Sequence, residues 1–325
     1  LILILRPLGM KSYVIQPIDG KGMGAIATKP IKFGDLILSE QPLFTVQSQL
    51  GIIPPSAIIE KLASKSDLEK RQYVNLANCH VGDRHPFLGI YSTNALPCGP
   101  AEGNAVAAKS GIFLDACRFN SSCVPSANNK WNATKGVMQF WAMRDINEGE
   151  ELSICYIDPL QSREGRRDVL RSGFGFLCQC AACSLSGEEA KASDDRRATL
   201  VRLTDEIGDN GKRPADRLKK VCLYPKDSGK LLLIRTKAKL ALRLAKEEGL
   251  VQLSRGFAYD AFQLCVFSSD LKHAKEWIRE ARKIAVGIEG PDSETTQECD
   301  EYVQNPNKHL FWGAGWKMTL EGPDK

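Results

Sequence analysis

Short apolar runs separated by turn residues dominate the first half of the chain. Each run is bounded by Gly, Pro, Asn, Asp or Ser, which is the pattern of strands joined by tight turns. We expect strands at residues 13–15, 25–27, 36–38, 42–46, 111–114, 136–142 and 151–156. The first half is therefore predicted to consist of small sheets.

Helical spacing interrupts this strand pattern between residues 54 and 78. Apolar side chains recur there at three- to four-residue intervals or multiples of them, at Ile58, Ile59, Leu62, Leu68 and Leu76. Residues 81–109 are rich in Pro and Gly, which predicts loops. The region after the first strands is thus predicted to be helical at first and then irregular.

A basic helix is expected at residues 162–172, followed by a polar linker or loop at residues 184–195. The basic side chains of this helix form a charge run, which predicts a solvated face; they are Arg163, Arg166, Arg167 and Arg171. The segment between the helix and the linker is rich in cysteine.

The second half is predicted to be helical, at residues 231–248, 251–267 and from 271 onward. Asp227, Ser228, Ser269 and Asp270 are candidate caps, and Gly249 follows the first of these helices. Two inward faces are expected, formed by Leu253, Phe257, Ala261, Leu264 and Cys265, and by Leu271, Ala274, Ile278, Ala281 and Ala285. Residues 238–249 and 274–287 are alike at an offset of about 36, which suggests helical hairpins resembling tetratricopeptide units.

Composition and charge narrow the possible classes of protein. The chain has 325 residues, enough for two domains, and its 43% hydrophobic and 26% charged content is that of a globular protein. No apolar run approaches the ~18 residues that span a bilayer. The net charge of +5 is shared by both halves. We therefore expect no membrane and no direct nucleic-acid partner.

The apolar run at residues 1–5 makes a poor signal peptide. No basic residue precedes it and no small-residue cleavage site follows it. The chain begins without Met, and Met10 is a candidate for a later start. We expect an intracellular protein, in the nucleus or the cytoplasm, whose cysteines are reduced.

Three of the eleven cysteines stand close together, at Cys178, Cys180 and Cys183. Thiolates at this spacing can occupy three corners of a tetrahedral zinc site, and the fourth ligand must come from elsewhere. Zinc is favoured over free structural thiols and over a redox role. The spacing leaves the fourth ligand open among Cys117, Cys123 and Cys155.

Four segments in order along the chain carry a resemblance to a known family. Residues 22–28, 118–125, 149–158 and 175–183 read GMGAIAT, RFNSSCVP, GEELSICYID and GFLCQCAAC. They resemble in turn the G-x-G-x-x-A-T, R-x-N-H-S-C-x-P, G-E-E-L-T-x-x-Y and F-x-C-x-C-x-x-C segments of the SET domain. Each motif is weak alone, but together they indicate a relative of SET proteins whose domain is split by an insert.

This resemblance implies an α+β fold, in which a SET-domain β-clip of small sheets contains a knot-like crossing and a helical insert. An all-α domain of helical hairpins follows. The SET domain is predicted at residues 11–183, with an insert at about 47–110 and a post-SET zinc segment at 174–183, and the helical domain at 187–325. Many such relatives carry a MYND zinc finger, but this insert offers only Cys79, His80, His85 and Cys98, so we predict none.

The resemblance also implies methyl transfer from S-adenosylmethionine to a lysine of a protein substrate, histone or non-histone. A lysine with a pKa of about 10.4 is mostly protonated at neutral pH, so the site must disfavour the cation. The sulfonium charge nearby has this effect. Tyr156 matches the family's channel tyrosine, whose hydroxyl orients the amine, and is the predicted catalytic residue and a cofactor contact.

Further site residues follow from the matched motifs. The cofactor contacts would come from Lys21, Gly22, Met23, Gly24, Asn94, Asn120, Ser121 and Phe176. Phe174 stands where relatives commonly have a second channel tyrosine. Cys123 matches the fourth ligand of one structural Zn²⁺, completed by Cys178, Cys180 and Cys183, which would tie the Asn120 loop to the post-SET turn.

The sequence departs from the family pattern at three positions, and two of these departures, Ser121 and Phe174, keep a second hypothesis open. Ser121 replaces the usual His, Ser126 replaces an Asn, and Phe174 removes a hydroxyl from the channel. The second hypothesis is a non-catalytic, zinc-stabilised scaffold that binds a protein partner through its helical half. A third, a redox or regulatory zinc protein, explains the cysteines alone. The first two differ in whether a methyl group is transferred.

Overall fold

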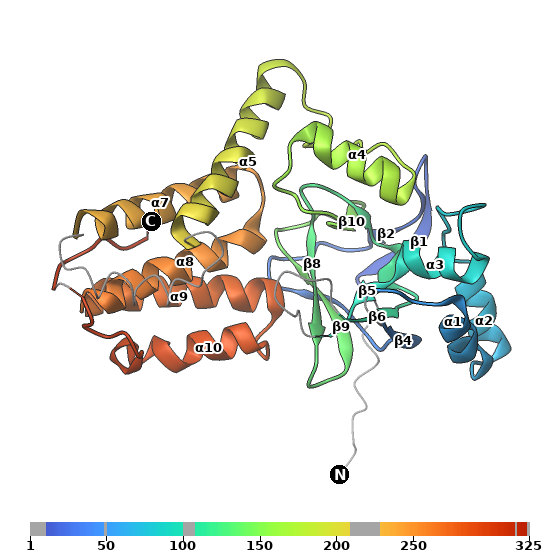
Figure 1. Ribbon diagram of the computed structural model, residues 1–325, viewed down its shortest axis with the longest axis horizontal. Coiled ribbons are helices and arrows are strands. Elements are labelled where there is room, and N and C mark those ends of the chain that lie inside the picture. The colour runs from blue at the N-terminus through green and yellow to red at the C-terminus, as the bar shows by residue number, and fades with distance from the viewer. Residues whose placement is uncertain (1–10, 49–50, 100–107, 209–227, 316, 324–325) are drawn as a thin grey trace, which may run out of the picture. The chain divides into compact units, whose positions relative to one another are not determined.

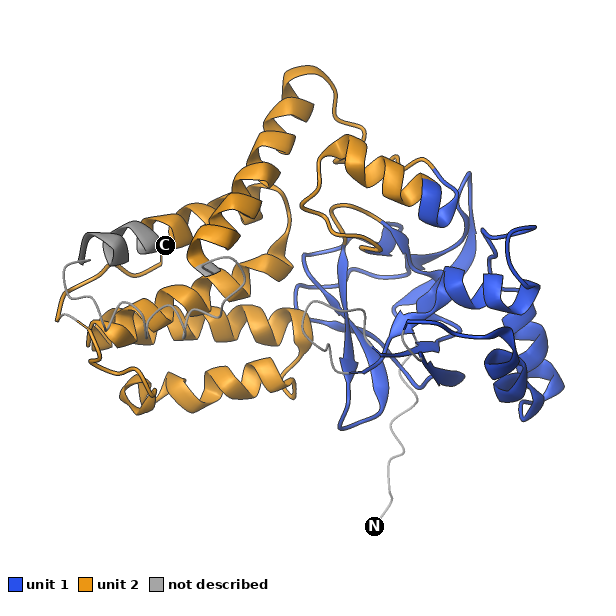
Figure 2. Cartoon of the chain, in the orientation of Figure 1, with its two compact units in different colours: residues 1–121, 126–154, 172–176 blue, residues 122–125, 155–171, 177–325 orange. Residues whose placement is uncertain are grey.

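The computed structural model describes residues 11–48, 51–99, 108–208, 228–315 and 317–323. The chain forms two compact units, coloured separately in Figure 2. The sheet unit comprises Leu1–Ser121, Ser126–Ile154 and Ser172–Phe176, and the helical unit comprises Ser122–Pro125, Cys155–Arg171 and Leu177–Lys325. Two short segments from the motif region thus belong to the helical unit, and the predicted domain limits at residues 183 and 187 stay a prediction.

A four-stranded sheet brings the motif segments of the sheet unit together. Its order is β1 (Tyr13–Ile18), β2 (Gly22–Ala27), β10 (Glu151–Ile154) and β7 (Asn120–Ser121). β1 and β2 form a hairpin with Gly20 in its turn and Gly22 at the start of β2; their φ of 68° and 71° lie in a region that favours glycine. β10 runs parallel to β7, with Ser153 opposite Asn120. Segments distant in sequence therefore become neighbouring strands.

The other described strands form two three-stranded sheets. One has the order β3 (Leu36–Glu40), β9 (Val137–Ala142) and β8 (Ala127–Asn132), and the other β4 (Phe44–Gln47), β6 (Lys109–Ile112) and β5 (Leu96–Pro97). Every predicted strand is present, with ends shifted by a few residues. β8 was not predicted, because its sequence ANNKWN has no apolar alternation, and it is held by antiparallel pairing with the buried β9.

Three helices lie in the insert: α1 (Pro55–Ala63), α2 (Asp67–Val74) and α3 (Pro86–Asn94). α1 and α2 confirm the helical spacing, and Ser66 starts α2 through a capping box with Glu69. The prediction of loops over residues 81–109 is wrong for α3. Pro86 stands in its first turn, where the missing N–H is not needed, so a residue that suggested a loop begins a helix.

The helical unit contains α4 (Arg163–Phe174) up to Arg171, α5 (Gly187–Gly208), α7 (Ser228–Glu247), α8 (Val251–Phe267), α9 (Leu271–Glu289) and α10 (Glu294–Val303). Short 3₁₀ helices lie at Pro306–Lys308 in this unit and at Ala116–Arg118 in the sheet unit. Figure 1 shows α8, α9 and α10 side by side, in the chain order expected of helical hairpins. No helix in the described part of the chain is both long and apolar enough to cross a membrane.

The helix predictions of the second half are largely confirmed. α8 spans the predicted residues, and α9 starts after Asp270, whose carboxylate accepts a hydrogen bond from the His273 N–H at 3.2 Å. The expected inward residues of α9 are buried except Leu271, which is exposed. Gly249 follows α7 with a φ of 67°, as a helix end allows. Asp227 lies outside the described residues.

The polar stretch at residues 184–195 is not a linker, because α5 begins at Gly187. The early turns of α5 bury Ser193 and Arg197, and the later turns bury Leu200 and Leu203. Apolar periodicity cannot detect a helix whose inward face begins with polar residues, and such residues are tolerated only when they find polar partners.

Candidate functional site

One corner of the four-stranded sheet gathers predicted cofactor residues around Glu151. Lys21 Nζ lies 2.6 Å from one carboxylate oxygen, and Asn120 Nδ2 donates to the other at 2.9 Å. The Lys21 N–H donates to the Ile18 carbonyl at 3.0 Å and closes the hairpin turn. The structure thus brings Lys21 and Asn120 together through a residue that the sequence analysis did not select, although its GEEL motif contained it.

Gly24 lies against the same corner and permits a close approach. A Cβ at this position would lie 2.2 Å from Ile18 Cδ1 and 2.8 Å from Asn120 Nδ2. A side chain at position 24 would therefore displace the ends of the Ile18 and Asn120 side chains from their present positions. Met23, between Gly24 and the left-handed Gly22, is 39% exposed.

Ser126, which stands where the family pattern has an asparagine, fits into the sheet unit through hydrogen bonds with β10. Ser126 is buried, its N–H donates to the Ser153 carbonyl at 3.1 Å, and its Oγ accepts from the Ser153 N–H at 2.9 Å. The motif loop and β10 therefore remain connected without the asparagine that relatives have there. Ser121 is half-buried on β7, opposite Ile154 of β10.

Asn94 is the last residue of α3, and its hydrogen bonds stabilise the local fold. Its Nδ2 donates to the carbonyls of Ala77 and Ile90, both at 2.7 Å, and its carbonyl accepts the Cys117 S–H at 3.1 Å. These bonds tie α3 to the preceding loop. The structure does not bring Asn94 to the Glu151 corner through any described hydrogen bond, so its cofactor role stays a prediction.

Phe174 and Phe176 are half-buried on either side of Gly175, whose φ is 75°. This segment belongs to the sheet unit and lies against Cys79, whose S–H donates to the Gly173 carbonyl at 3.5 Å. A Cβ on Gly175 would contact Cys79 Cβ at 3.5 Å. The left-handed glycine therefore turns the chain between the two aromatic side chains.

Tyr156 follows β10 by two residues and is half-buried. The S–H of the preceding Cys155 donates to the Ile157 carbonyl at 3.1 Å, which bends the chain around Tyr156. Burial raises the pKa of the Cys155 thiol above its usual value. Cys155 is therefore a neutral hydrogen-bond donor here and is not part of the cysteine cluster.

The cysteine cluster lies within the helical unit. The Sγ atoms of Cys123, Cys178, Cys180 and Cys183 all lie within 4.8 Å of one another. The Cys123 N–H donates to Cys180 Sγ at 3.4 Å, and the Cys183 N–H donates to the Cys180 carbonyl at 2.9 Å. Of the candidates for a fourth ligand, the fold brings Cys123 to the turn. Four sulfur ligands in this arrangement suit a structural Zn²⁺.

Two further observations fit a metal at this cluster. Hydrogen bonds with the other three thiols hold the pKa of Cys180 well below its usual value, whereas hydrogen bonds with its neighbours raise the pKa of Cys123, so Cys180 carries negative charge within the cluster. Arg166 beside it is 0% exposed, and its Nε and Nη2 have no oxygen acceptor among the described residues. Burial alone would lower the pKa of Arg166, but the charge on Cys123 and Cys183 raises it.

The prediction that the arginines of α4 form a solvated face is therefore wrong for Arg166 in the middle of the helix. Arg166 is buried beside the cysteines, Arg163 and Arg167 are half-buried, and only Arg171 is exposed. The Arg167 Nε donates to the Cys178 carbonyl at 3.3 Å. A zinc ion held by four thiolates carries net negative charge, which a buried guanidinium offsets. The charge run is a feature of the cysteine site.

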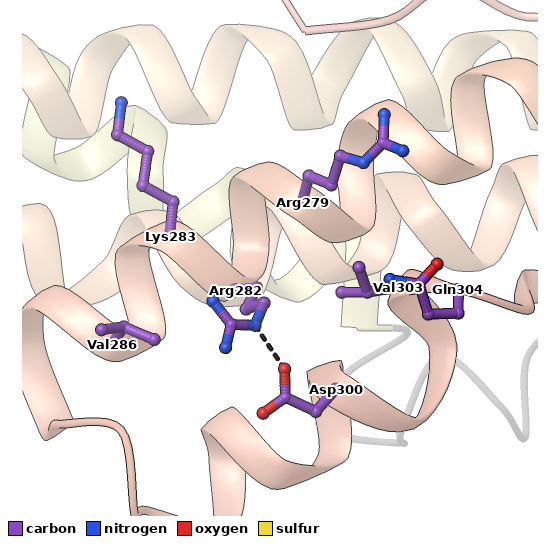
Figure 3. A pocket seen from close by; sticks show the side chains of 7 residues that line it. All are labelled: Arg279, Arg282, Lys283, Val286, Asp300, Val303 and Gln304. Carbon is purple, nitrogen blue, oxygen red and sulfur yellow. Dashed lines mark hydrogen bonds and ion pairs between the residues drawn. The ribbon is translucent and has the colours of Figure 1, made fainter.

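A groove of about 670 Å³ lies between α9 and α10 of the helical unit, and Figure 3 shows its side chains. Its lining residues are Arg279, Arg282, Lys283, Val286, Asp300, Val303 and Gln304. Arg282 forms an ion pair with Asp300. None of the predicted cofactor, channel or zinc residues lines this groove.

Known proteins resemble the chain over most of its length. The family model of the SET domain matches residues 22–157. Histone-lysine N-methyltransferase set5 of Schizosaccharomyces pombe is 30% identical over 308 residues, which cover 94% of this chain and 88% of that protein. Protein-lysine N-trimethyltransferase SMYD5 of Homo sapiens is 33% identical over 89 residues, or 26% of this chain and 21% of that protein. A solved SET domain of LSMT, bound to lysine and AdoHcy, shares 14% identity over 91% of this chain and 87% of that one, with a TM-score of 0.36.

The small sheets, the helical insert and the matched motif segments define a SET-domain fold. The chain belongs to the SET-domain family of lysine methyltransferases. The resemblance and the α+β fold predicted from the four motifs are thereby confirmed. The match to set5 extends beyond residue 157 and includes most of the helical half.

Proposed function

We propose that the protein is an S-adenosylmethionine-dependent protein-lysine N-methyltransferase. The observation that carries the proposal is the β1-β2-β10-β7 sheet, which joins Lys21, Gly24 and Asn120 around Glu151 on the strand that leads to Tyr156. Relatives named as histone-lysine and protein-lysine methyltransferases support the same reaction.

In this proposal each residue acts by holding a reacting group in place. S-adenosylmethionine supplies the methyl group as a sulfonium. The Tyr156 hydroxyl accepts a hydrogen bond from the neutral lysine amine and orients its lone pair, and the Asn120 amide contacts the cofactor. Phe176 packs beside the adenine. Alignment of this kind provides a large part of the acceleration in transfers between two bound reactants.

The finer properties are also part of the proposal. Phe174 removes a hydroxyl from the lysine channel, so we expect the number of methyl groups added to differ from that of relatives with tyrosine there. The substrate is a protein lysine, histone or non-histone, and the protein acts in the nucleus or the cytoplasm. One Zn²⁺ held by Cys123, Cys178, Cys180 and Cys183 stabilises the loop that follows Asn120.

The first experiment is calorimetric titration of the purified, zinc-loaded protein with S-adenosylmethionine. We expect micromolar binding that Asn120→Ala abolishes and that Asn305→Ala, at an exposed position, leaves unchanged. Absence of binding to the folded protein would favour the non-catalytic scaffold.

The second experiment measures methyl transfer to histones and to a broad protein lysate. Tyr156→Phe is expected to lower the rate about 100-fold, because the amine loses its orienting partner. Tyr302→Phe in α10 is the matched control and should retain the rate. Cofactor binding without transfer to any lysine would contradict the proposed activity.

A further inference from the structure

A buried arginine of the helical half contacts both chain segments that follow predicted site residues. Arg197 in α5 is 0% exposed. Its Nη1 donates to the Pro159 carbonyl, and its Nη2 donates to the Cys123 carbonyl at 3.4 Å. Pro159 lies three residues after Tyr156, and Cys123 lies three residues after Asn120. One guanidinium therefore connects the segment of the predicted catalytic residue with the loop of a zinc ligand.

Glu248, directly after α7, holds this guanidinium in place. Its carboxylate is 4% exposed and accepts from Arg197 Nε at 2.8 Å and from Ser193 Oγ at 2.7 Å. Arg196 Nε donates to its other oxygen at 2.6 Å. A buried carboxylate with several charge-assisted donors has little freedom to move. Glu248 thus holds Arg197 of α5 against the end of α7.

The end of α7 also touches the Cys123 loop directly. Gly249 has a φ of 67°, and a Cβ there would lie 2.6 Å from Val124 Cγ1. The backbone after the helix therefore packs closely against Val124, next to the proposed zinc ligand Cys123, and a side chain at position 249 would displace Val124. The contact is independent of the Arg197 hydrogen bonds and acts on the same loop.

We propose that Arg197 and Glu248 are positioning residues for methyl transfer. Through them the helical half holds the Tyr156 segment and the Cys123 loop in one geometry. This inference rests on the proposed function only for its effect on the rate. A misplacement of about 1 Å can reduce the rate of a transfer between aligned groups about 100-fold. Loss of these hydrogen bonds, although they lie away from the reacting atoms, is therefore expected to lower the rate of methyl transfer. The helical half is then part of the catalytic framework.

The test compares four variants with the wild-type protein, one of which, Arg197→Lys, is used only in the second readout. Arg197→Met removes the hydrogen bonds but leaves the buried Glu248 carboxylate without its buried charge partner, which destabilises the fold for that reason alone. The double variant Arg197→Met with Glu248→Met removes both charges and keeps the volume. Arg282→Met is the matched control, since it breaks the Arg282–Asp300 pair shown in Figure 3 on the exposed side of the same half.

The first readout is peptide-level hydrogen exchange of the zinc-loaded proteins, which needs no substrate. In the double variant we expect exchange at residues 155–164 and 120–127 to rise at least about tenfold, a change of about 1.4 kcal/mol in local opening. Exchange within α8 and α9 should stay unchanged. The control should match the wild type throughout. Unchanged exchange in both segments of the folded double variant would overturn the proposal.

The second readout is steady-state methyl transfer. We expect kcat to fall about 10- to 100-fold while the KM for S-adenosylmethionine changes less than about threefold, and Arg197→Lys to recover part of kcat. A folded double variant with the wild-type kcat would overturn the positioning role. If the wild type itself transfers no methyl group, the proposed function fails, and the exchange measurement still decides whether the helical half orders the two segments.

Discussion

Two charged clusters, one in each unit, differ in their exposure to solvent. In the sheet unit, the Lys21 and Glu151 side chains are 45% and 22% exposed. In the helical unit, the Arg197 and Glu248 side chains are 0% and 4% exposed. Both clusters connect segments that are far apart in sequence. The first can be rearranged by a ligand at low cost, whereas the second cannot.

The difference separates a charged pair that a ligand can rearrange from one that stays fixed. An exposed ion pair contributes about 0–1 kcal/mol, so Lys21 and Glu151 can exchange partners when a ligand arrives. A buried pair loses several kcal/mol when one partner is removed, because the other charge stays desolvated. The corner around Glu151, which we propose as the cofactor corner, is therefore adjustable, while the network around Arg197 behaves as a fixed frame for the Cys123 loop.

Zinc removal is expected to have the largest effect on this frame. A chelator, or the Cys183→Ser variant, removes a ligand set whose metal binding is worth on the order of 10 kcal/mol in small zinc domains. We expect metal loss and a strongly lowered thermal midpoint, measured by a zinc-release assay and thermal unfolding. Cys98→Ala, at a buried cysteine outside the cluster, should keep its zinc. A zinc-loaded Cys183→Ser protein with normal stability would disprove the site.

Glu248→Ala should have the next largest effect. It leaves Arg197 buried without its carboxylate, and we expect the free energy of unfolding to fall by about 3–5 kcal/mol in urea titrations. The neighbouring Glu247 is 47% exposed, so Glu247→Ala should cost less than about 1 kcal/mol. Equal losses from the two variants would remove the distinction between the fixed and the adjustable cluster.

Gly24→Ala tests the cofactor corner. The new Cβ must displace Ile18 or Asn120, so we expect the affinity for S-adenosylmethionine to fall at least about tenfold, or about 1.4 kcal/mol. Gly256→Ala in α8 is the control, because a Cβ there meets no atom within 4 Å and the helix gains up to about 1 kcal/mol. Calorimetric titration of both variants compares them. If Gly24→Ala binds S-adenosylmethionine as tightly as the wild type, Gly24 is not part of the cofactor site.

Lys21→Met should have the smallest effect on stability. The exposed pair with Glu151 predicts a loss below about 1 kcal/mol, and the loss should shrink further at high salt. Urea titrations at low and high ionic strength measure it. A loss comparable to that of Glu248→Ala would show that the cofactor corner is as rigid as the buried network.

Sequence reasoning predicted the parts of the molecule that apolar pattern and motif spacing describe. The strands of the first half, α8 and α9 follow from periodicity, and the spacing of Cys178, Cys180 and Cys183 indicates a metal. Cys123 as the fourth ligand required the family resemblance, since it lies 55 or more positions from the other three. Local spacing contains no information on such a partner.

The sequence was least informative where charged residues are buried. Arg166 was expected on a solvated face, and Arg197, just after the predicted linker, was given no role, because an arginine in a polar stretch is usually exposed. Both are buried through specific partners, the cysteine cluster for one and Glu248 for the other. Glu151 was missed for a related reason: its role depends on Lys21 and Asn120, which reach it only through strand pairing.

The bond between Arg197 and the Cys123 carbonyl has a consequence for the order of folding. The two residues are 74 positions apart, and Glu248 is synthesised a further 51 residues after Arg197. Contacts of such long range form late, and chains fold as they leave the ribosome. The loop that follows Asn120 therefore cannot reach its final form until α7 has been translated. The catalytic framework is completed only after the helical half exists.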